Sequence, residues 1–157
     1  WARLRTYIYW VRLTKKPDPF LERLSWRVEP SLKLGRLQEA LSLFEGIHDF
    51  SAFAMKSGER NPIVTMKEAC IRGPFGDNLY FLFRASHFLR KMVRILVSCL
   101  IEVGSGRMTA DELRSALESD SLLQPPAPAP AQGLYLAHVL YPEGLKVFER
   151  SLWDEEE

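Results

Sequence analysis

Arg94 is the side chain whose type and setting in this sequence most strongly suggest chemistry. It interrupts an otherwise apolar run at residues 92–97. An arginine next to a protein core needs an anionic partner, because an unpaired buried charge costs several kcal/mol. A charged stripe open to water is the alternative interpretation, and the residues alone give the two equal weight.

Tyr7 also has a chemical and a structural interpretation. An aromatic side chain on a strand usually packs in the core or against a neighbouring strand. Tyr7, however, is bracketed by Arg5 and Tyr9, and an aromatic ring in such a setting can stack on a nucleic-acid base. Both interpretations stay open at this level.

The basic residues gather in two windows, although the formal net charge is only +1. Residues 1–16 contain no acid, and neither do residues 78–101. Basic residues interleaved with aromatic ones favour a polyanionic partner such as nucleic acid, while a solvated charged face is the commoner structural alternative. The basic and histidine side chains of the two windows are Arg3, Arg5, Arg12, Lys15 and Lys16, followed by Arg84, His87, Arg90, Lys91 and Arg94.

The histidines and cysteines do not favour a metal site or covalent catalysis. His48, His87 and His138 belong to three separate segments and form no H-E-x-x-H or similar pair. Cys70 and Cys99 form no C-x-x-C motif. The sequence also contains no nucleophile elbow and no glycine-rich phosphate loop. We therefore expect neither a metal site nor a thiol redox site.

Composition predicts a globular chain from a reducing compartment. The 157 residues, 46% hydrophobic and 26% charged, form one domain or a large piece of one, and exclude disorder and a disulfide scaffold. The most apolar stretch, residues 92–103, is far shorter than the roughly 20 residues that cross a bilayer. We expect a protein of the cytoplasm, or alternatively of an organelle, with no membrane partner. The chain starts at Trp1, without an initiator Met and inside a predicted strand, so we expect a fragment.

The periodicity of apolar residues predicts an α+β fold, with an antiparallel or mixed sheet and helices packed on one face. Strands are expected at residues 3–13, 63–72, 78–86 and 133–141, and amphipathic helices at 34–45 and 88–103. Thr109 is expected to cap a further short helix. Residues 48–62 are expected to form a loop, and residues 124–131, with four prolines, a stiff extended linker.

On a helical wheel, the predicted helix at residues 88–103 is apolar except for one narrow polar stripe. This element is therefore expected to be buried along most of its circumference. The stripe comprises Arg90, Lys91, Arg94, Ser98 and Glu102.

Four motifs occur in a fixed order along nearly the whole chain. They are Arg-Thr-Tyr-Ile-Tyr at residues 5–9, Gly-Ile-His-Asp-Phe-Ser-Ala-Phe at 46–53, Phe-Leu-Arg-Lys-Met-Val-Arg at 88–94 and Ala-Pro-Ala-Pro-Ala-Gln-Gly-Leu-Tyr-Leu at 127–136. Together they closely resemble the C-terminal half of the bacterial-type tRNA pseudouridine synthase A (TruA) family. The resemblance implies that residues 1–157 form the C-terminal part of such a catalytic domain, a pseudouridine synthase-like half domain.

The resemblance implies an isomerase that uses no metal or organic cofactor. Such enzymes break the N-glycosidic bond of a uridine in the anticodon arm of tRNA, turn the base and rejoin it through carbon. In the family an aspartate is the nucleophile, a tyrosine stacks on the target base and an arginine pairs with the aspartate. Tyr7 matches the tyrosine and Arg94 the arginine, while Arg5, Arg90 and Lys91 would contact RNA phosphates.

The family carries its aspartate in a loop of the N-terminal half, and no aspartate of this chain has matching surroundings. The chain alone is therefore expected to be inactive, with tRNA and the missing half, or a partner chain that carries the aspartate, as its partners. The resemblance also implies a homodimer when the protein is complete.

Three positions depart from the family's pattern and leave other functions open. Ser98 replaces a usual glycine, Ile95 a polar residue and Val64 a basic residue. These changes would allow a catalytically inactive RNA-binding or assembly protein with the same fold. A third alternative is an interaction domain whose basic stripe is only solvated.

Overall fold

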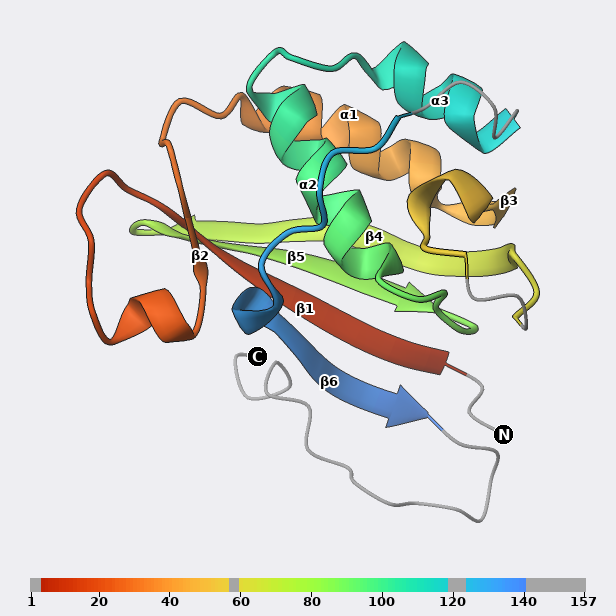
Figure 1. Ribbon diagram of the computed structural model, residues 1–157, viewed down its shortest axis with the longest axis horizontal. Coiled ribbons are helices and arrows are strands. Elements are labelled where there is room, and N and C mark those ends of the chain that lie inside the picture. Colours follow the sequence, from red (N-terminus) through yellow and green to blue (C-terminus); the bar gives the residue numbers. More distant parts are fainter. Residues whose placement is uncertain (1–3, 57–59, 119–123, 141–157) are drawn as a thin grey trace.

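The computed structural model describes residues 4–56, 60–118 and 124–140, so Trp1, Arg3 and the last position of the strand expected at 133–141 lie outside the described residues. Six strands form one mixed sheet, and three α-helices pack against one face of it (Figure 1). The predicted α+β class is therefore confirmed. The strands are β1 (Leu4–Leu13), β2 (Trp26–Val28), β3 (Gly46–Asp49), β4 (Ile63–Phe75), β5 (Asn78–Ala85) and β6 (Leu134–Leu140), and the helices are α1 (Leu34–Phe44), α2 (Met92–Gly104) and α3 (Ala110–Glu118).

β1 lies inside the sheet and pairs with three other strands. The strand order is β2-β1-β5-β4-β3, and β6 also pairs with β1. β6 runs antiparallel along residues 4–9 of β1, while β2 runs parallel along residues 11–13. β2 and β6 therefore share one edge of β1, and β5 takes the other edge.

Both faces of β1 are covered, as its alternating pattern predicts. Tyr9 and Val11 are fully buried on the face that meets the helices. On the other face, Thr6 and Ile8 are also buried. A strand with this double burial is held firmly, which suits it to position side chains of a site.

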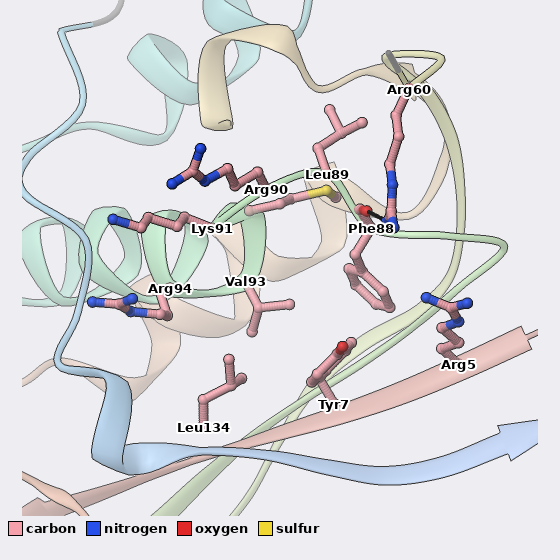
Figure 2. Close-up of a pocket in the computed structure, with 11 residues that line it drawn as sticks. Arg5, Tyr7, Arg60, Phe88, Leu89, Arg90, Lys91, Val93, Arg94 and Leu134 are labelled. Carbon is pink, nitrogen blue, oxygen red and sulfur yellow. Dashed lines mark hydrogen bonds between the residues drawn. The ribbon is translucent and has the colours of Figure 1, made fainter. Parts of the chain in front are cut away.

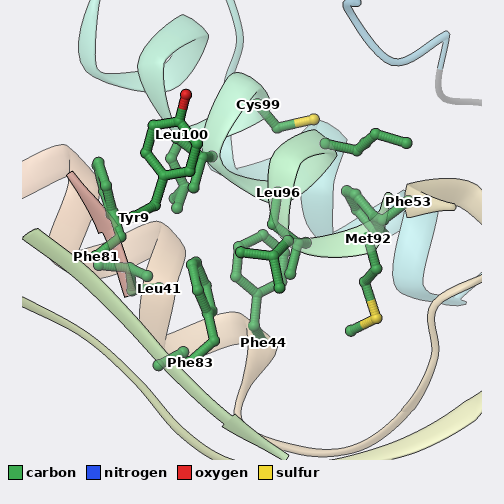
Figure 3. Close-up of a cluster of buried hydrophobic side chains, with 14 of the residues drawn as sticks. Tyr9, Leu41, Phe44, Phe53, Phe81, Phe83, Met92, Leu96, Cys99 and Leu100 are labelled. Carbon is green, nitrogen blue, oxygen red and sulfur yellow. The ribbon is translucent and has the colours of Figure 1, made fainter. Parts of the chain in front are cut away.

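The core lies between the sheet and the helices (Figure 3). α1 contributes Leu37, Leu41 and Phe44, whose spacing places them on one helix face. These side chains meet the fully buried Phe81 and Phe83 of β5. Eleven of the thirteen residues of α2 are buried, which confirms that most of this helix is covered.

α2 begins four residues later than the wheel analysis predicts, and this changes the predicted stripe. Lys91 adopts a left-handed backbone conformation with φ 58°, which a right-handed helix does not accommodate. Arg90 and Lys91 therefore belong to the loop before α2, and the prediction that they lie on its polar stripe is wrong. No helix in the three described ranges has the length and apolar character to cross a membrane.

Two short strands are not predicted from the sequence. β2 has three residues, and β3 has four and covers the start of the expected loop. β3 pairs antiparallel with residues 63–66 of β4. Elements this short show no periodicity of their own, because their positions are set by hydrogen bonds to a neighbouring strand.

Part of the first basic window is paired within the chain. The buried guanidinium of Arg12 donates to Ser25 Oγ at 2.8 Å and to Glu22 at 3.0 Å. Arg27 also donates to Glu22, at 2.7 Å, and this hydrogen bond is the main reason why the pKa of Glu22 is lowered. Lys15 lies 3.8 Å from Glu29. These pairs hold the segment before β2. Among the described residues of this window, Arg5 is the cation that lines the site described below.

Candidate functional site

One pocket collects side chains from distant parts of the chain. Its volume is about 440 Å³, and it lies between β1, the start of α2 and β6 (Figure 2). All five side chains that the sequence analysis put forward contribute to its lining. They are Tyr7, Arg94, Arg5, Arg90 and Lys91.

Tyr7 is half-buried in the pocket wall and meets the ring of Phe88. The two ring centroids are 4.9 Å apart, and the planes are almost perpendicular at 88°. This is a favourable aromatic geometry. Among the described residues no ring stacks in parallel on Tyr7, so the contact with Phe88 orients the tyrosine without covering it by a second flat ring.

Arg94 lies in the first turn of α2 and is half-buried. Its Nε donates a hydrogen bond to the carbonyl oxygen of Ala129 at 2.6 Å. The guanidinium has four further N–H donors, and no carboxylate of the described residues forms an ion pair with it. The side chain is therefore anchored on one side and retains donors for an anionic partner.

Arg90 and Lys91 reach the pocket from the loop before α2 rather than from the helix. The left-handed conformation of Lys91 separates this loop from the first helical turn. The carbonyl oxygen of Arg90 accepts a hydrogen bond from the backbone N–H of Met55 at 3.0 Å. The two cations are thus presented by a loop that is fixed to a second segment of the chain.

Arg60 lines the same pocket, and the sequence analysis missed it. Its Nη1 donates to the carbonyl oxygen of Phe88 at 2.6 Å (Figure 2). The neighbouring Asn61 carbonyl accepts from His87 Nε2 at 2.8 Å. Arg60 lies in a segment without periodicity, outside both basic windows. Its position in the pocket wall therefore follows from the structure, through its contact with the loop before α2, and not from the sequence pattern.

The pocket is strongly positive. Its lining holds five basic side chains, from Arg5, Arg60, Arg90, Lys91 and Arg94, and none of the described lining residues is Asp or Glu. In Figure 2 the ring of Tyr7 lies between two groups of these cations, Arg5 and Arg60 on one side and Arg90, Lys91 and Arg94 on the other. The charged ends of the latter three point away from the ring. Positive charges with an accessible aromatic ring suit a polyanion that carries flat bases.

The predicted linker at residues 124–131 packs against α2. Residues 124–130 form neither helix nor strand, and a 3-10 turn at Ala131–Gly133 leads into β6. Ala129 is buried, and its backbone bonds to Arg94. The segment therefore forms a wall beside the pocket, next to Leu134, which lines it.

The remaining histidines and cysteines have structural surroundings. His48 lies with Nε2 2.7 Å from the carbonyl oxygen of Glu45. Burial raises the pKa of Cys99 to about 12 and that of Cys70 to about 11, which keeps both thiols protonated at neutral pH. Within the described ranges, no group of three His, Cys, Asp or Glu side chains is arranged to hold a metal ion.

Comparison with known proteins gives the family. The sequence profile of a family described as tRNA pseudouridine synthase matches residues 40–142. The tRNA pseudouridine synthase A of Burkholderia thailandensis is 40% identical over 140 residues, which cover 88% of this chain and 51% of that protein. The Thermodesulfovibrio yellowstonii protein of the same name is 33% identical over 153 residues, covering 89% of this chain and 59% of that protein. The Caulobacter protein of that name is 36% identical over 142 residues, covering 89% and 56%.

The chain thus spans between half and three fifths of the length of these curated relatives. The matched region contains Arg60, Arg90, Lys91 and Arg94, four of the five cations of the pocket. The match covers about two thirds of the chain, and the relatives align over nearly all of it. The chain belongs to the TruA family of tRNA pseudouridine synthases.

Proposed function

We propose that the full-length protein converts uridine to pseudouridine in the anticodon arm of tRNA, and that this chain supplies the C-terminal half of the active site. The observation that carries the proposal is that Tyr7 and Arg94, which are 87 positions apart in the sequence, line one positive pocket. The pocket volume of 440 Å³ lies within the range of about 300–1,000 Å³ that is usual for small-ligand sites.

In this proposal Tyr7 and Arg94 have separate roles. The ring of Tyr7 stacks on the target uracil and is placed to help remove the proton from C5. Arg94 forms a forked ion pair with the nucleophilic aspartate, which the missing N-terminal half brings to the pocket. The N1–C1′ bond of the nucleotide breaks, the base turns, and a C5–C1′ bond forms in its place, while C5 loses its proton and N1 gains one.

The other cations hold the RNA backbone. Arg5, Arg90, Lys91 and Arg60 contact phosphates and place the target nucleotide, without reading its sequence. The proposed partners are tRNA, the N-terminal half with its aspartate and, in the complete protein, a second copy of the chain in a homodimer. The proposed location of the protein is the cytoplasm.

The test uses the full-length protein and tRNA that carries tritium at C5 of its uridines. Isomerisation moves C1′ onto C5 and releases this hydrogen to water, so the expected result is tritium release from the anticodon arm. The matched control is this chain alone, which is expected to release none. Tight tRNA binding by the full-length protein without tritium release would contradict the proposed activity.

That contradicting result is what the second candidate function, an inactive RNA-binding or assembly protein, predicts. The positive pocket supports this candidate as well, because five basic side chains suit RNA binding with or without catalysis. Val64 and Ile95, two departures from the family pattern, are buried. Reading the coding sequence upstream of Trp1 separates the two functions, because an Arg-Thr-Asp-Ala-Gly type loop there is required for the enzyme.

Replacing Arg60 with glutamine is expected to weaken tRNA binding by the full-length protein and to reduce its salt dependence. Loss of one phosphate contact lowers the slope of log Kd against log salt concentration by about 0.7–0.9. The measurement is filter binding over a salt series. The control Arg114→Gln removes a cation that pairs with Asp111 on α3 and does not line the pocket. An equal slope change in both variants would show that Arg60 is not part of the tRNA interface.

A further inference from the structure

The backbone of residues 127–130, hereafter the strap, is fixed to α2 and β1 by four hydrogen bonds. Ser98 Oγ donates to the carbonyl oxygen of Ala127 at 2.6 Å. The backbone N–H of Ala129 donates to the carbonyl oxygen of Arg94 at 3.0 Å, and Arg94 Nε donates back to the carbonyl of Ala129. Tyr9 Oη donates to the carbonyl oxygen of Pro130 at 2.6 Å.

The strap and α2 match each other in spacing. Ser98 and Arg94 are four residues apart on the helix, which corresponds to a rise of about 6 Å. Their acceptors, Ala127 and Ala129, are two residues apart on an extended Pro-rich chain, which also spans about 6 Å. The strap therefore runs antiparallel to α2 with both contacts in register, so the bond at Ser98 sets the position of the carbonyl that Arg94 uses.

The strap is also stiff. Pro128 and Pro130 have fixed φ angles and no backbone N–H, so the N–H of Ala129 is the donor at the centre of the strap. Ala129 is 1% exposed and Ser98 is 6% exposed. Water therefore competes little for these hydrogen bonds, and the carbonyl of Ala129 is a fixed point.

We propose that Ser98, acting through the strap, is a positioning residue for the guanidinium of Arg94. The bond from Nε to Ala129 uses one of five donors and fixes the plane of the group. The two Nη atoms then remain available for a forked pair with a carboxylate. This inference rests on the proposed function for its purpose, but the positioning itself is a property of the described residues.

The first test is spectroscopic and needs no catalytic activity. In the full-length protein the Nε–H of Arg94 is expected to give a slowly exchanging NMR signal, assigned by its loss in Arg94→Lys. Ser98→Ala is expected to speed the exchange of this proton and of the Ala129 amide by roughly tenfold, because the strap opens locally more often. Unchanged exchange of both protons in Ser98→Ala would overturn the proposal.

Two further variants make this test specific. Ser98→Thr keeps a hydroxyl at the same position and is expected to retain slow exchange. Ser42→Ala removes a hydroxyl that donates to the Glu39 carbonyl on α1 at 2.6 Å, away from the strap, and is expected to leave both signals unchanged. A faster exchange of equal size in Ser42→Ala would show a general loosening and would also overturn the proposal.

The second test is kinetic. Loss of one neutral hydrogen bond that orients Arg94 is expected to lower kcat of the full-length protein by about 3- to 10-fold. The KM for tRNA is expected to stay unchanged, because Ser98 does not line the pocket. A fall in tRNA affinity with unchanged kcat would contradict the positioning role. Failure of the wild-type protein to isomerise uridine would instead reject the proposed function, while the NMR test would still decide the inference.

Discussion

Replacement of Arg94 by lysine in the full-length protein is expected to lower kcat by roughly 100-fold or more, the scale of losing a preorganised charged contact. The affinity for tRNA is expected to change by less than about threefold, because the positive charge is retained. The separation between these two effects follows from the geometry of the side chain, since in the proposed site Arg94 makes two different kinds of contact, one with the strap and one with the aspartate.

A lysine cannot reproduce both contacts of Arg94. The arginine donates to the carbonyl of Ala129 through Nε, and the two Nη atoms stay available for a forked carboxylate pair. A single ammonium group has no planar fork and no second nitrogen to anchor itself. It must therefore divide its donors between the strap and the aspartate of the proposed site.

The measurement is single-turnover isomerisation of tRNA beside an independent binding titration. Arg114→Lys is the matched control, because Arg114 lies on α3 and pairs with Asp111; this variant is expected to behave as the wild type. If Arg94→Lys weakens binding and turnover to the same extent, Arg94 is a phosphate contact and not the partner of a nucleophile.

Replacement of Gly133 by alanine is expected to destabilise the fold by about 1–3 kcal/mol, the usual cost of overpacking a core. A Cβ atom at this position would lie 2.6 Å from Cζ and 2.9 Å from Oη of Tyr9. The tyrosine cannot easily move away. It is fully buried, its ring packs at 87° against Trp26, and its hydroxyl is bonded to Pro130.

Urea unfolding of the full-length protein measures this effect, with Gly35→Ala as the control. Gly35 lies in α1, and a Cβ there would meet nothing within 4 Å. The control is therefore expected to stabilise the protein by about 0.5–1 kcal/mol, since alanine favours a helix more than glycine does. Equal stability of Gly133→Ala and wild type would show that Tyr9 and the strap are not packed as described.

The sequence predicted those parts of the fold in which many residues repeat one pattern. β1, α1 and the β4–β5 hairpin have enough alternating or helical positions to be recognised. The predicted cap of α3 is also confirmed, because Thr109 Oγ1 accepts a hydrogen bond from the backbone N–H of Glu112 at 3.2 Å. By contrast, the start of α2 depends on a single left-handed residue, Lys91, which a wheel of apolar positions does not reveal.

The site was predictable only in part, for a related reason. Motifs identified Tyr7 and Arg94, and charge patterning identified Arg5, Arg90 and Lys91. Arg60 is held at the pocket by one hydrogen bond to a backbone carbonyl. Every residue has such a carbonyl, so the residue types in the sequence do not indicate this contact. The strap was hidden in the same way, since prolines at 125–130 indicate stiffness but not what the stiff segment touches.

The burial of Tyr9 links the position of Tyr7, at one end of the site, to that of Arg94, at the other end. Tyr7 and Tyr9 are two positions apart on β1, so their side chains leave the same face of one rigid strand. Tyr7 supplies one of the pocket's aromatic rings, while Tyr9 holds the segment to which Arg94 is anchored. Tyr7 and the anchor of Arg94 are thus both attached to β1, so a small displacement of this strand is expected to move them together and to preserve the distance between them.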